Sequence, residues 1–270
     1  MSTQCAIRRK TVSDLARMMH DNEPIVMCTA YDFHSARLVD KANIDAILVG
    51  DSLGMTMLGY DSTVPVTMDD MVLFTSVVAR VTQRAFIMAD MPFMSYHRSV
   101  EQALANATRL IQEAGAQAVK LEGATPLTLE IIERLTASGI PVVAHLGLTP
   151  QSINVLGGYK TQAREDAAAQ ELKAHAQAVQ KAGAVAVVLE CIPEDLALEV
   201  SQASAIPTIG IGAGPGCHGQ VQVFHDLMGY GTFQPKHAKR YMDAEKAIGE
   251  ALAAYRTEVK NQTFLPTQKG

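Results

Sequence analysis

Short apolar runs alternate with helical patterns along the chain, and this alternation restricts the fold more than any other feature. One example is the run Ala-Ile-Leu-Val over 46–49, which leads directly into Gly50-Asp51-Ser52. A wholly apolar run that opens into a turn is typical of a parallel strand buried on both faces. We expect the strands to be eight runs of this kind: 24–30, 44–49, 85–89, 116–121, 141–144, 184–189, 206–211 and 221–224.

The stretches between these runs carry helical spacing and capping signals. The predicted helices are 33–41, 68–82, 100–114, 128–138, 165–182, 194–204 and 239–259. Repeated strand–helix units predict an α/β fold of the closed (β/α)8 type, a TIM barrel, in which active sites lie at the carboxyl ends of the strands. An open doubly wound sheet is the alternative, but the number of strands and the chain length favour closure.

The chain has no linker or shift in composition that would divide it. We therefore expect a single barrel domain over 1–270, a size at which a barrel is routinely one domain. An N-terminal helical extension over 1–23, with its helix at 11–20, is expected to precede the barrel. Residues 260–270 are expected to form a flexible tail.

The charge and the cysteine pattern exclude several classes of protein. The net charge is −5, so no basic surface favours nucleic acid. Residues 1–10 lack the apolar core of a signal peptide, and the longest aliphatic run, 184–189, is far shorter than the ~20 residues of a membrane helix. We expect a cytoplasmic protein without membrane contact. Scattered cysteines without a C-x-x-C pair agree with a reducing compartment and exclude a disulfide framework or a cysteine–zinc site: Cys5, Cys28, Cys191 and Cys217.

Ionisable residues follow most of the predicted strands. A charged group at the end of an apolar strand is costly unless it is paired, liganded or hydrated. In a barrel these groups would converge on one mouth, where chemistry takes place. They are Asp51, Asp90, Lys120, Glu122, His145 and Glu190, with Ser52 beside the first.

Three of these residues, Asp51, Asp90 and Glu122, suit a hard divalent cation. Carboxylates without a cysteine or a histidine cluster favour Mg²⁺, which keeps positions open for water and substrate oxygens. The alternative is that each carboxylate caps a helix or pairs with an arginine. Three acids on one predicted face favour the metal.

The other ionisable residues have candidate roles and structural alternatives. Glu190 ends a wholly apolar strand and is a candidate general base, although it could pair with a buried cation. Lys120 could bind a substrate carboxylate or only neutralise Glu122. His145 could stabilise an oxyanion, move protons or serve as a structural histidine. Ser52 could donate to a carboxylate, but a serine after aspartate is also common in turns.

A glycine-rich run, Gly-Ala-Gly-Pro-Gly over 212–216, follows the seventh strand. Barrels often bind phosphate at this place, but the spacing is not a dinucleotide fingerprint and no P-loop lysine follows. We favour a tight turn over a phosphate cradle.

Several of these motifs occur together in one known family. GDSLG (50–54), ADMPF (89–93), VKLEG (119–123), HLGLTPQ (145–151), LEC (189–191) and IGIGAG (209–214) together resemble ketopantoate hydroxymethyltransferases. The resemblance extends from about residue 28 to residue 241. The phosphoenolpyruvate mutase and isocitrate lyase superfamily shares the barrel but not the HLGLTPQ-like stretch.

The resemblance implies transfer of a hydroxymethyl group from the co-substrate 5,10-methylenetetrahydrofolate to 3-methyl-2-oxobutanoate. It implies that Asp51 and Asp90 bind Mg²⁺ and the substrate and that Glu122 approaches the metal through water. Ser52 and Lys120 would bind the substrate carboxylate. It further implies a homo-oligomer, typically a decamer. Glu190 would accept the proton, with His145 beside the substrate.

One departure and two alternatives remain. His218, in the loop after the seventh strand, stands where the family usually has aspartate. The family pattern therefore does not predict the contacts of this loop, nor whether the loop contacts folate or another subunit. A carbon–carbon lyase or mutase of the phosphoenolpyruvate mutase class is the enzymatic alternative, although its cysteine-bearing lid motif is absent after the fourth strand. A metal-binding barrel without turnover would explain the acids but not a separate Glu190.

Overall fold

The computed structural model describes residues 7–231 and 234–265. By its internal contacts the chain divides into two compact units, Met1–Gln222 and Val223–Gly270, and all strands belong to the first. The expectation of one domain over the whole chain therefore stays a prediction. The predicted flexible tail lies partly outside the described residues, and its remainder forms the end of a helix and exposed turns.

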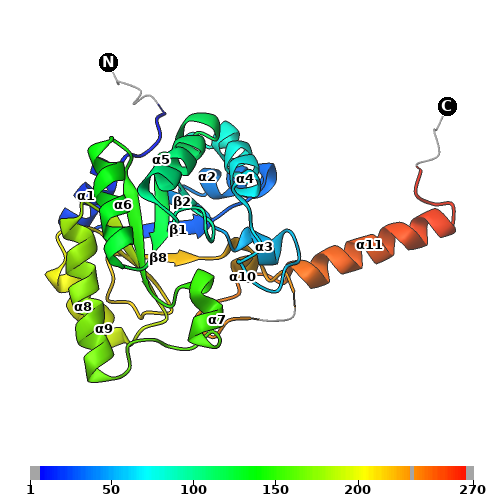
Figure 1. Cartoon of the computed structure of the whole chain (residues 1–270). Coiled ribbons are helices and arrows are strands. Elements are labelled where there is room, and N and C mark those ends of the chain that lie inside the picture. The colour runs from blue at the N-terminus through cyan, green and yellow to red at the C-terminus, as the bar shows by residue number, and fades with distance from the viewer. Residues whose placement is uncertain (1–6, 232–233, 266–270) are drawn as a thin grey trace, which may run out of the picture. The chain divides into compact units, whose positions relative to one another are not determined.

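The first unit is a closed barrel of eight parallel strands, which confirms the predicted fold. β1 pairs with β2 on one side and with β8 on the other, so the sheet has no free edge. The helices of the unit lie around the strands (Figure 1). The strands are β1 (Ile25–Thr29), β2 (Ala46–Val49), β3 (Phe86–Asp90), β4 (Ala118–Glu122), β5 (Val142–Gly147), β6 (Ala186–Glu190), β7 (Thr208–Ile211) and β8 (Gly219–Gln222).

The helices of this unit follow the predicted pattern, with added short segments in the loops. Within the described residues no helix is long and apolar enough to cross a bilayer. The elements are α1 (Val12–His20), α2 (Phe33–Lys41), α3 (Leu53–Thr56), α4 (Met68–Val81), α5 (Val100–Thr108), a π-helix (Arg109–Glu113), α6 (Pro126–Ala137), a 3₁₀ turn (Pro150–Ser152), α7 (Ile153–Leu156), α8 (Asp166–Lys181) and α9 (Glu194–Ala203).

One buried apolar cluster joins α1 to the strands of the barrel. Leu15 and Met18 of α1 belong to the same buried cluster as the first inward-facing strand residues, among them Ile25 and Phe86. The N-terminal helix therefore packs against the amino ends of the strands with its apolar face. This arrangement leaves the carboxyl ends of the strands for polar groups.

Most boundaries differ from the prediction by one to five residues, and three of these differences are informative. The helix predicted over 100–114 changes to a π-helix after Thr108. The eighth strand starts at Gly219, two residues before the predicted start, where it pairs with Ile25 so closely that a Cβ would lie 2.4 Å from the Ile25 carbonyl oxygen. Only glycine allows this approach, and glycine is rarely taken as a strand signal. The last helix begins later than predicted, after Asp243 accepts the N–H of Lys246 as its N-cap.

The second unit contains α10 (Phe224–Met228) and α11 (Ala244–Lys260). α11 carries four large apolar side chains at helical spacing, and they are 44 to 63% exposed: Ile248, Leu252, Tyr255 and Val259. Tyr255 packs edge-to-face against Phe264, with 5.0 Å between the ring centroids, but the four side chains together still form an exposed apolar stripe.

Candidate active site

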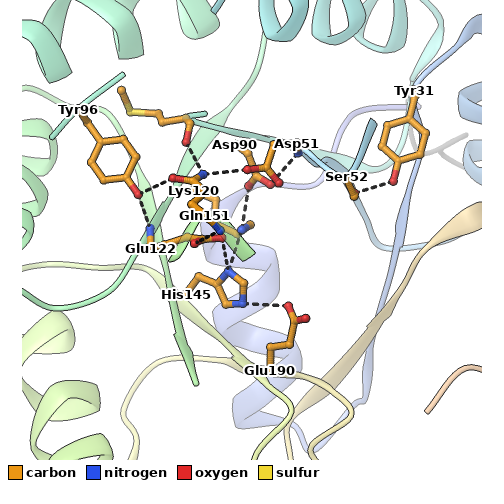
Figure 2. A network of polar contacts seen from close by, with 11 residues as sticks. Tyr31, Asp51, Ser52, Asp90, Tyr96, Lys120, Glu122, His145, Gln151 and Glu190 are labelled. Carbon is orange, nitrogen blue, oxygen red and sulfur yellow. Dashed lines mark hydrogen bonds and ion pairs between the residues drawn. The ribbon is translucent and has the colours of Figure 1, made fainter. Parts of the chain in front are cut away.

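The six ionisable residues predicted from the strand ends meet in one polar network at the carboxyl end of the barrel (Figure 2). The strand register explains the meeting. Asp90 is the Cα partner of Lys120, and Glu122 is that of His145. Side chains of such partners point the same way from the sheet, so each acid meets a base.

Lys120 forms a buried ion pair with Asp90. Its Nζ lies 3.0 Å from Asp90 Oδ1 and 3.1 Å from His145 Nδ1. Burial works to lower the pKa of Lys120, but the charges of Asp90, Glu122 and Asp51 outweigh it and raise the pKa above its ordinary value. The charged form of Lys120 is therefore favoured, and its Nζ lies within hydrogen-bond distance of both Asp90 and His145.

His145 lies between two glutamates. Its Nδ1 is 3.3 Å from Glu122 Oε1, and its Nε2 is 3.1 Å from Glu190 Oε2. Burial and Lys120 lower its pKa, but the contacts with Glu122 and Glu190 raise it, to a net value of about 9. The imidazolium form faces one carboxylate on each side, whereas the neutral form can accept from Lys120 through Nδ1.

Asp51 and Asp90 are adjacent buried carboxylates. The backbone N–H of Asp51 donates to Asp90 Oδ2 at 3.0 Å. The pKa of Asp51 is raised well above its ordinary value by burial, then by the charges of Asp90 and Glu122. Burial also raises the pKa of Asp90, against the effect of Lys120. Three buried carboxylates thus face one lysine and one histidine, so full ionisation of all three would leave an excess of negative charge.

The acids of this network each have one oxygen held by a directed donor. Asp51 Oδ2 accepts from the side chain of Gln151, Asp90 Oδ2 from the backbone of Asp51, and Glu122 Oε2 from the backbone of Gln151. Asp90 Oδ1 and Glu122 Oε1 are buried without a directed hydrogen bond, although each lies near a cation. Among the residues that the structure describes, no group of three or more His, Cys, Asp or Glu side chains is placed so that it could hold a metal ion.

The sequence comparisons agree with one another. A family model for ketopantoate hydroxymethyltransferase matches residues 9–268. A relative from Geobacillus thermodenitrificans (strain NG80-2), named 3-methyl-2-oxobutanoate hydroxymethyltransferase, is 55% identical over 256 residues, which cover 94% of this chain and 91% of the relative. One of the same name from Syntrophus aciditrophicus (strain SB) is 52% identical and covers 98% of this chain and 97% of its own. The chain belongs to the ketopantoate hydroxymethyltransferase family. This family catalyses the first step of pantothenate biosynthesis.

Solved structures add the fold alone. A phosphonopyruvate hydrolase in complex with oxalate and Mg²⁺ has a TM-score of 0.65 at 15% identity and covers 96% of this chain and 93% of its own. A 2,3-dimethylmalate lyase of the phosphoenolpyruvate mutase and isocitrate lyase superfamily has a TM-score of 0.56 at 16% identity, with 96% and 91% covered. The lyase or mutase alternative is thus supported by fold only, whereas the relatives above 50% identity are ketopantoate hydroxymethyltransferases.

Three residues of the network are not predicted as site residues from the sequence. Gln151 links Asp51 to Glu122, and Tyr96 bonds both Gln151 Oε1 at 3.1 Å and the backbone N–H of Glu122 at 3.0 Å. Tyr31, fully buried after β1, bonds Ser52 Oγ at 2.8 Å. Each of the three follows a strand, so its position in the sequence could have indicated a site residue. An uncharged side chain is common after a strand, however, and position alone does not distinguish it.

The glycine-rich run after β7 has a packing role. A side chain at Gly214 would lie 2.4 Å from Glu194 Cγ, and one at Gly216 would lie 2.9 Å from Leu198 Cβ. Both neighbours belong to α9. The glycines therefore permit close approach to this helix, which supports the tight-turn interpretation over a phosphate cradle.

Gly147 packs directly against the backbone of Glu190. The two residues are Cα partners in neighbouring strands, and Gly147 has a φ of +93°. A side chain here would lie 2.3 Å from the carbonyl oxygen of Glu190 and 2.7 Å from Ile192 Cγ2. Nearby backbone would have to shift to admit it.

Gly147→Ala is therefore expected to displace Glu190 and to lower kcat by about 100-fold, the order that a 1 Å misplacement costs. Steady-state kinetics of the folded variant would measure it. Gly139→Ala is the matched control, since Gly139 has a φ of +84° but no atom within 4 Å of the added carbon. Equal kcat losses in the two variants would show backbone strain, not displacement of Glu190, to be the cause.

His218 lies at the amino ends of β7 and β8, away from the network. Its Nδ1 accepts the backbone N–H of Thr208 at 3.2 Å and lies 2.9 Å from Thr208 Oγ1. This places the departure from the family pattern among contacts within the barrel. Burial lowers the pKa of His218 from its ordinary 6.5.

This contact predicts a loss of stability in acid. The folded state holds His218 neutral, so below pH 6.5 the unfolded state binds more protons and the free energy of unfolding falls as the pH falls. His218→Asp keeps an acceptor without this titration, and its melting temperature is expected to fall less than that of the parent between pH 7 and about pH 5. His175→Asn is the control, because His175 is a partly exposed histidine of α8. Parallel melting curves for parent and His218→Asp would contradict the prediction.

Proposed function

We propose that the network binds 3-methyl-2-oxobutanoate and removes its C3 proton, so that C3 attacks the one-carbon unit of 5,10-methylenetetrahydrofolate. Carbon–carbon bond formation at C3, with water supplying the hydroxyl oxygen, gives 2-dehydropantoate and tetrahydrofolate. The observation that carries the proposal is the separation of charges: Lys120 and the acids form one group, and Glu190 stands on the far side of His145.

Glu190 suits the role of proton acceptor. Its side chain is 16% exposed, whereas the side chains of Asp90 and Lys120 are 4% exposed. A substrate at the barrel mouth can reach a group with that exposure. His145 Nε2 lies beside Glu190 Oε2 and orients the carboxylate, which leaves its second oxygen for the proton.

Lys120 and Ser52 suit the substrate carboxylate. A charged Lys120 has three N–H groups, and its contacts with Asp90 and His145 leave at least one of them for a substrate carboxylate. The hydroxyl of Ser52 is held by Tyr31, which is itself fully buried. A hydroxyl positioned in this way loses little freedom when it binds an anion.

The acids suit a divalent cation. They are in excess over the cations of the network, and Asp90 Oδ1 and Glu122 Oε1 lack directed hydrogen bonds. Mg²⁺ usually takes one or two carboxylates and keeps its other positions for water and substrate oxygens, so an incomplete protein ligand set is the expected one. Asp51 and Asp90 would hold the ion, with Glu122 near it. When bound, the ion acts as a Lewis acid that stabilises negative charge developing on the 2-oxo acid.

Deuterium exchange tests this function without folate. With Mg²⁺ in D₂O, the enzyme is expected to replace the C3 hydrogen of 3-methyl-2-oxobutanoate with deuterium, which NMR follows directly. Chelation of the metal should stop the exchange. Exchange at the uncatalysed rate in the presence of Mg²⁺ would contradict proton removal at this site.

We also propose a homo-oligomer of the decameric type in the cytoplasm. The apolar stripe of α11 defined above supports association, because exposed apolar stripes of this kind usually pack against a partner. The cysteines that the structure describes, Cys28, Cys191 and Cys217, are all free, which supports a reducing compartment. Light scattering of the native protein measures the mass, and a monomer would contradict the oligomer.

A further inference from the structure

Gln151 makes more contacts in the network than its neutral side chain suggests. It is 5% exposed and follows β5 in the first turn after Thr149-Pro150. Its Nε2 donates to Asp51 Oδ2 at 2.8 Å and to the carbonyl oxygen of Met91 at 2.9 Å. Its backbone N–H donates to Glu122 Oε2 at 3.0 Å. One residue thus touches the loops after β2 and β3 and the last residue of β4.

The orientation of the Gln151 amide is determined by its partners. A carboxylate oxygen and a backbone carbonyl can only accept, so they require the NH₂ group on their side. Tyr96 O–H donates to Gln151 Oε1 at 3.1 Å and accepts the N–H of Glu122. Both hydrogens and the oxygen of the amide are therefore used, and a flipped amide would lose all three bonds.

The contacts hold two of the three acids in a defined direction. Gln151 binds Asp51 through Oδ2 and Glu122 through Oε2. The other oxygen of Glu122, Oε1, faces His145 Nδ1 at 3.3 Å, and Gln151 leaves Asp51 Oδ1 free of its own contacts. Carboxylates that ligate metals are commonly oriented by such donors, and loss of the donor typically costs 10–100-fold in metal affinity or activity.

We propose that Gln151 is a positioning residue that orients Asp51 and Glu122 for the divalent cation, with Tyr96 holding its amide. The inference rests on the metal of the proposed function. Gln151 and Tyr96 themselves would touch neither the substrate nor the metal, because they act only by donating hydrogen bonds that orient the acids. A purely structural role would lower stability without changing the affinity for the ion.

Titration with Mg²⁺ alone, followed by calorimetry, tests the proposal. Gln151→Met keeps the length of the side chain but removes both donors and the acceptor. It is expected to weaken Mg²⁺ binding at least 10-fold relative to the parent. Tyr96→Phe removes only the hydroxyl that holds the amide, and it is expected to weaken binding in the same direction by a smaller factor. If Gln151→Met does not fold, the result for Tyr96→Phe decides.

Gln117→Met is the matched control. Gln117 also uses both ends of its amide, since it accepts from Ile87 N–H and donates to the Lys10 carbonyl, but it lies near the amino ends of the strands. This variant is expected to lose thermal stability and to keep the Mg²⁺ affinity of the parent. The double variant Gln151→Met/Tyr96→Phe is expected to bind no more weakly than Gln151→Met, because the two act as one unit.

Unchanged Mg²⁺ affinity in Gln151→Met, with a lower melting temperature, would overturn the proposal and leave the proposed function standing. Equal weakening in Gln117→Met would also overturn it, because a general loss of stability would then be the cause. Failure of the parent itself to bind Mg²⁺ would instead overturn the metal of the proposed function, and this inference with it.

Discussion

Glu190→Gln is expected to abolish exchange of the C3 hydrogen of 3-methyl-2-oxobutanoate while the protein still folds and binds Mg²⁺. The amide has nearly the same shape as the carboxylate but cannot accept a proton at neutral pH. A positioned general base typically contributes a factor of 10²–10⁴ to the rate. The exchange rate should therefore fall by about 100-fold or more. His145 would keep its neighbour, since the amide oxygen can still accept from Nε2.

Deuterium incorporation measured by NMR, with saturating Mg²⁺, gives the rate for the parent and the variant. Glu194→Gln is the control, because Glu194 is an exposed residue at the start of α9 in the same loop region. It should exchange at the parent rate. If Glu190→Gln keeps the exchange rate of the parent, Glu190 is not the base, and His145 becomes the group to test.

The convergence of the ionisable residues follows from the strand pattern alone. Apolar strands of a parallel barrel all end at one face, so the acid or base after each strand must arrive there. The register then brings Asp90 to Lys120 and Glu122 to His145. The convergence does not depend on the detailed conformation of a loop, so it is predictable from the order of the residues. The register is not, and the pairing of Lys120 with Asp90 and of His145 with Glu122 is seen only in the structure.

Gln151 and Tyr96 are not predictable in the same way. Both lie in loops whose paths are determined by tertiary contacts, and neither carries a charge that would be costly at a strand end. A buried amide becomes informative only when its partners are known. The start of β8 is hidden for a related reason, since Gly219 is selected by its closeness to the Ile25 backbone and not by strand propensity.

The excess of buried negative charge leads to a second prediction with a large effect. Asp51→Asn is expected to abolish the binding of Mg²⁺ and the metal-dependent binding of the substrate. The metal-free variant is expected to be at least as stable as the metal-free parent. The pKa of Asp51 is raised by burial and by the charges of Asp90 and Glu122, so its ionised form opposes folding. The neutral amide removes that repulsion, and its oxygen can still accept from Gln151.

Melting curves with and without Mg²⁺ separate the two effects of Asp51→Asn. A ligand that binds only the folded state stabilises it by about 2.7 kcal/mol at 100 times its Kd, so the parent should melt higher with Mg²⁺ and the variant should not respond. Asp40→Asn is the opposite control. Asp40 is a buried carboxylate that accepts three backbone N–H groups, from Gln83, Arg84 and Ala85. Its loss should cost roughly 1–3 kcal/mol of the free energy of unfolding but preserve the response to Mg²⁺.

A response to Mg²⁺ in Asp51→Asn equal to that of the parent would remove Asp51 from the metal site. A lower melting temperature of the metal-free variant would show that its carboxylate stabilises the fold, so function and stability would not be opposed at this position.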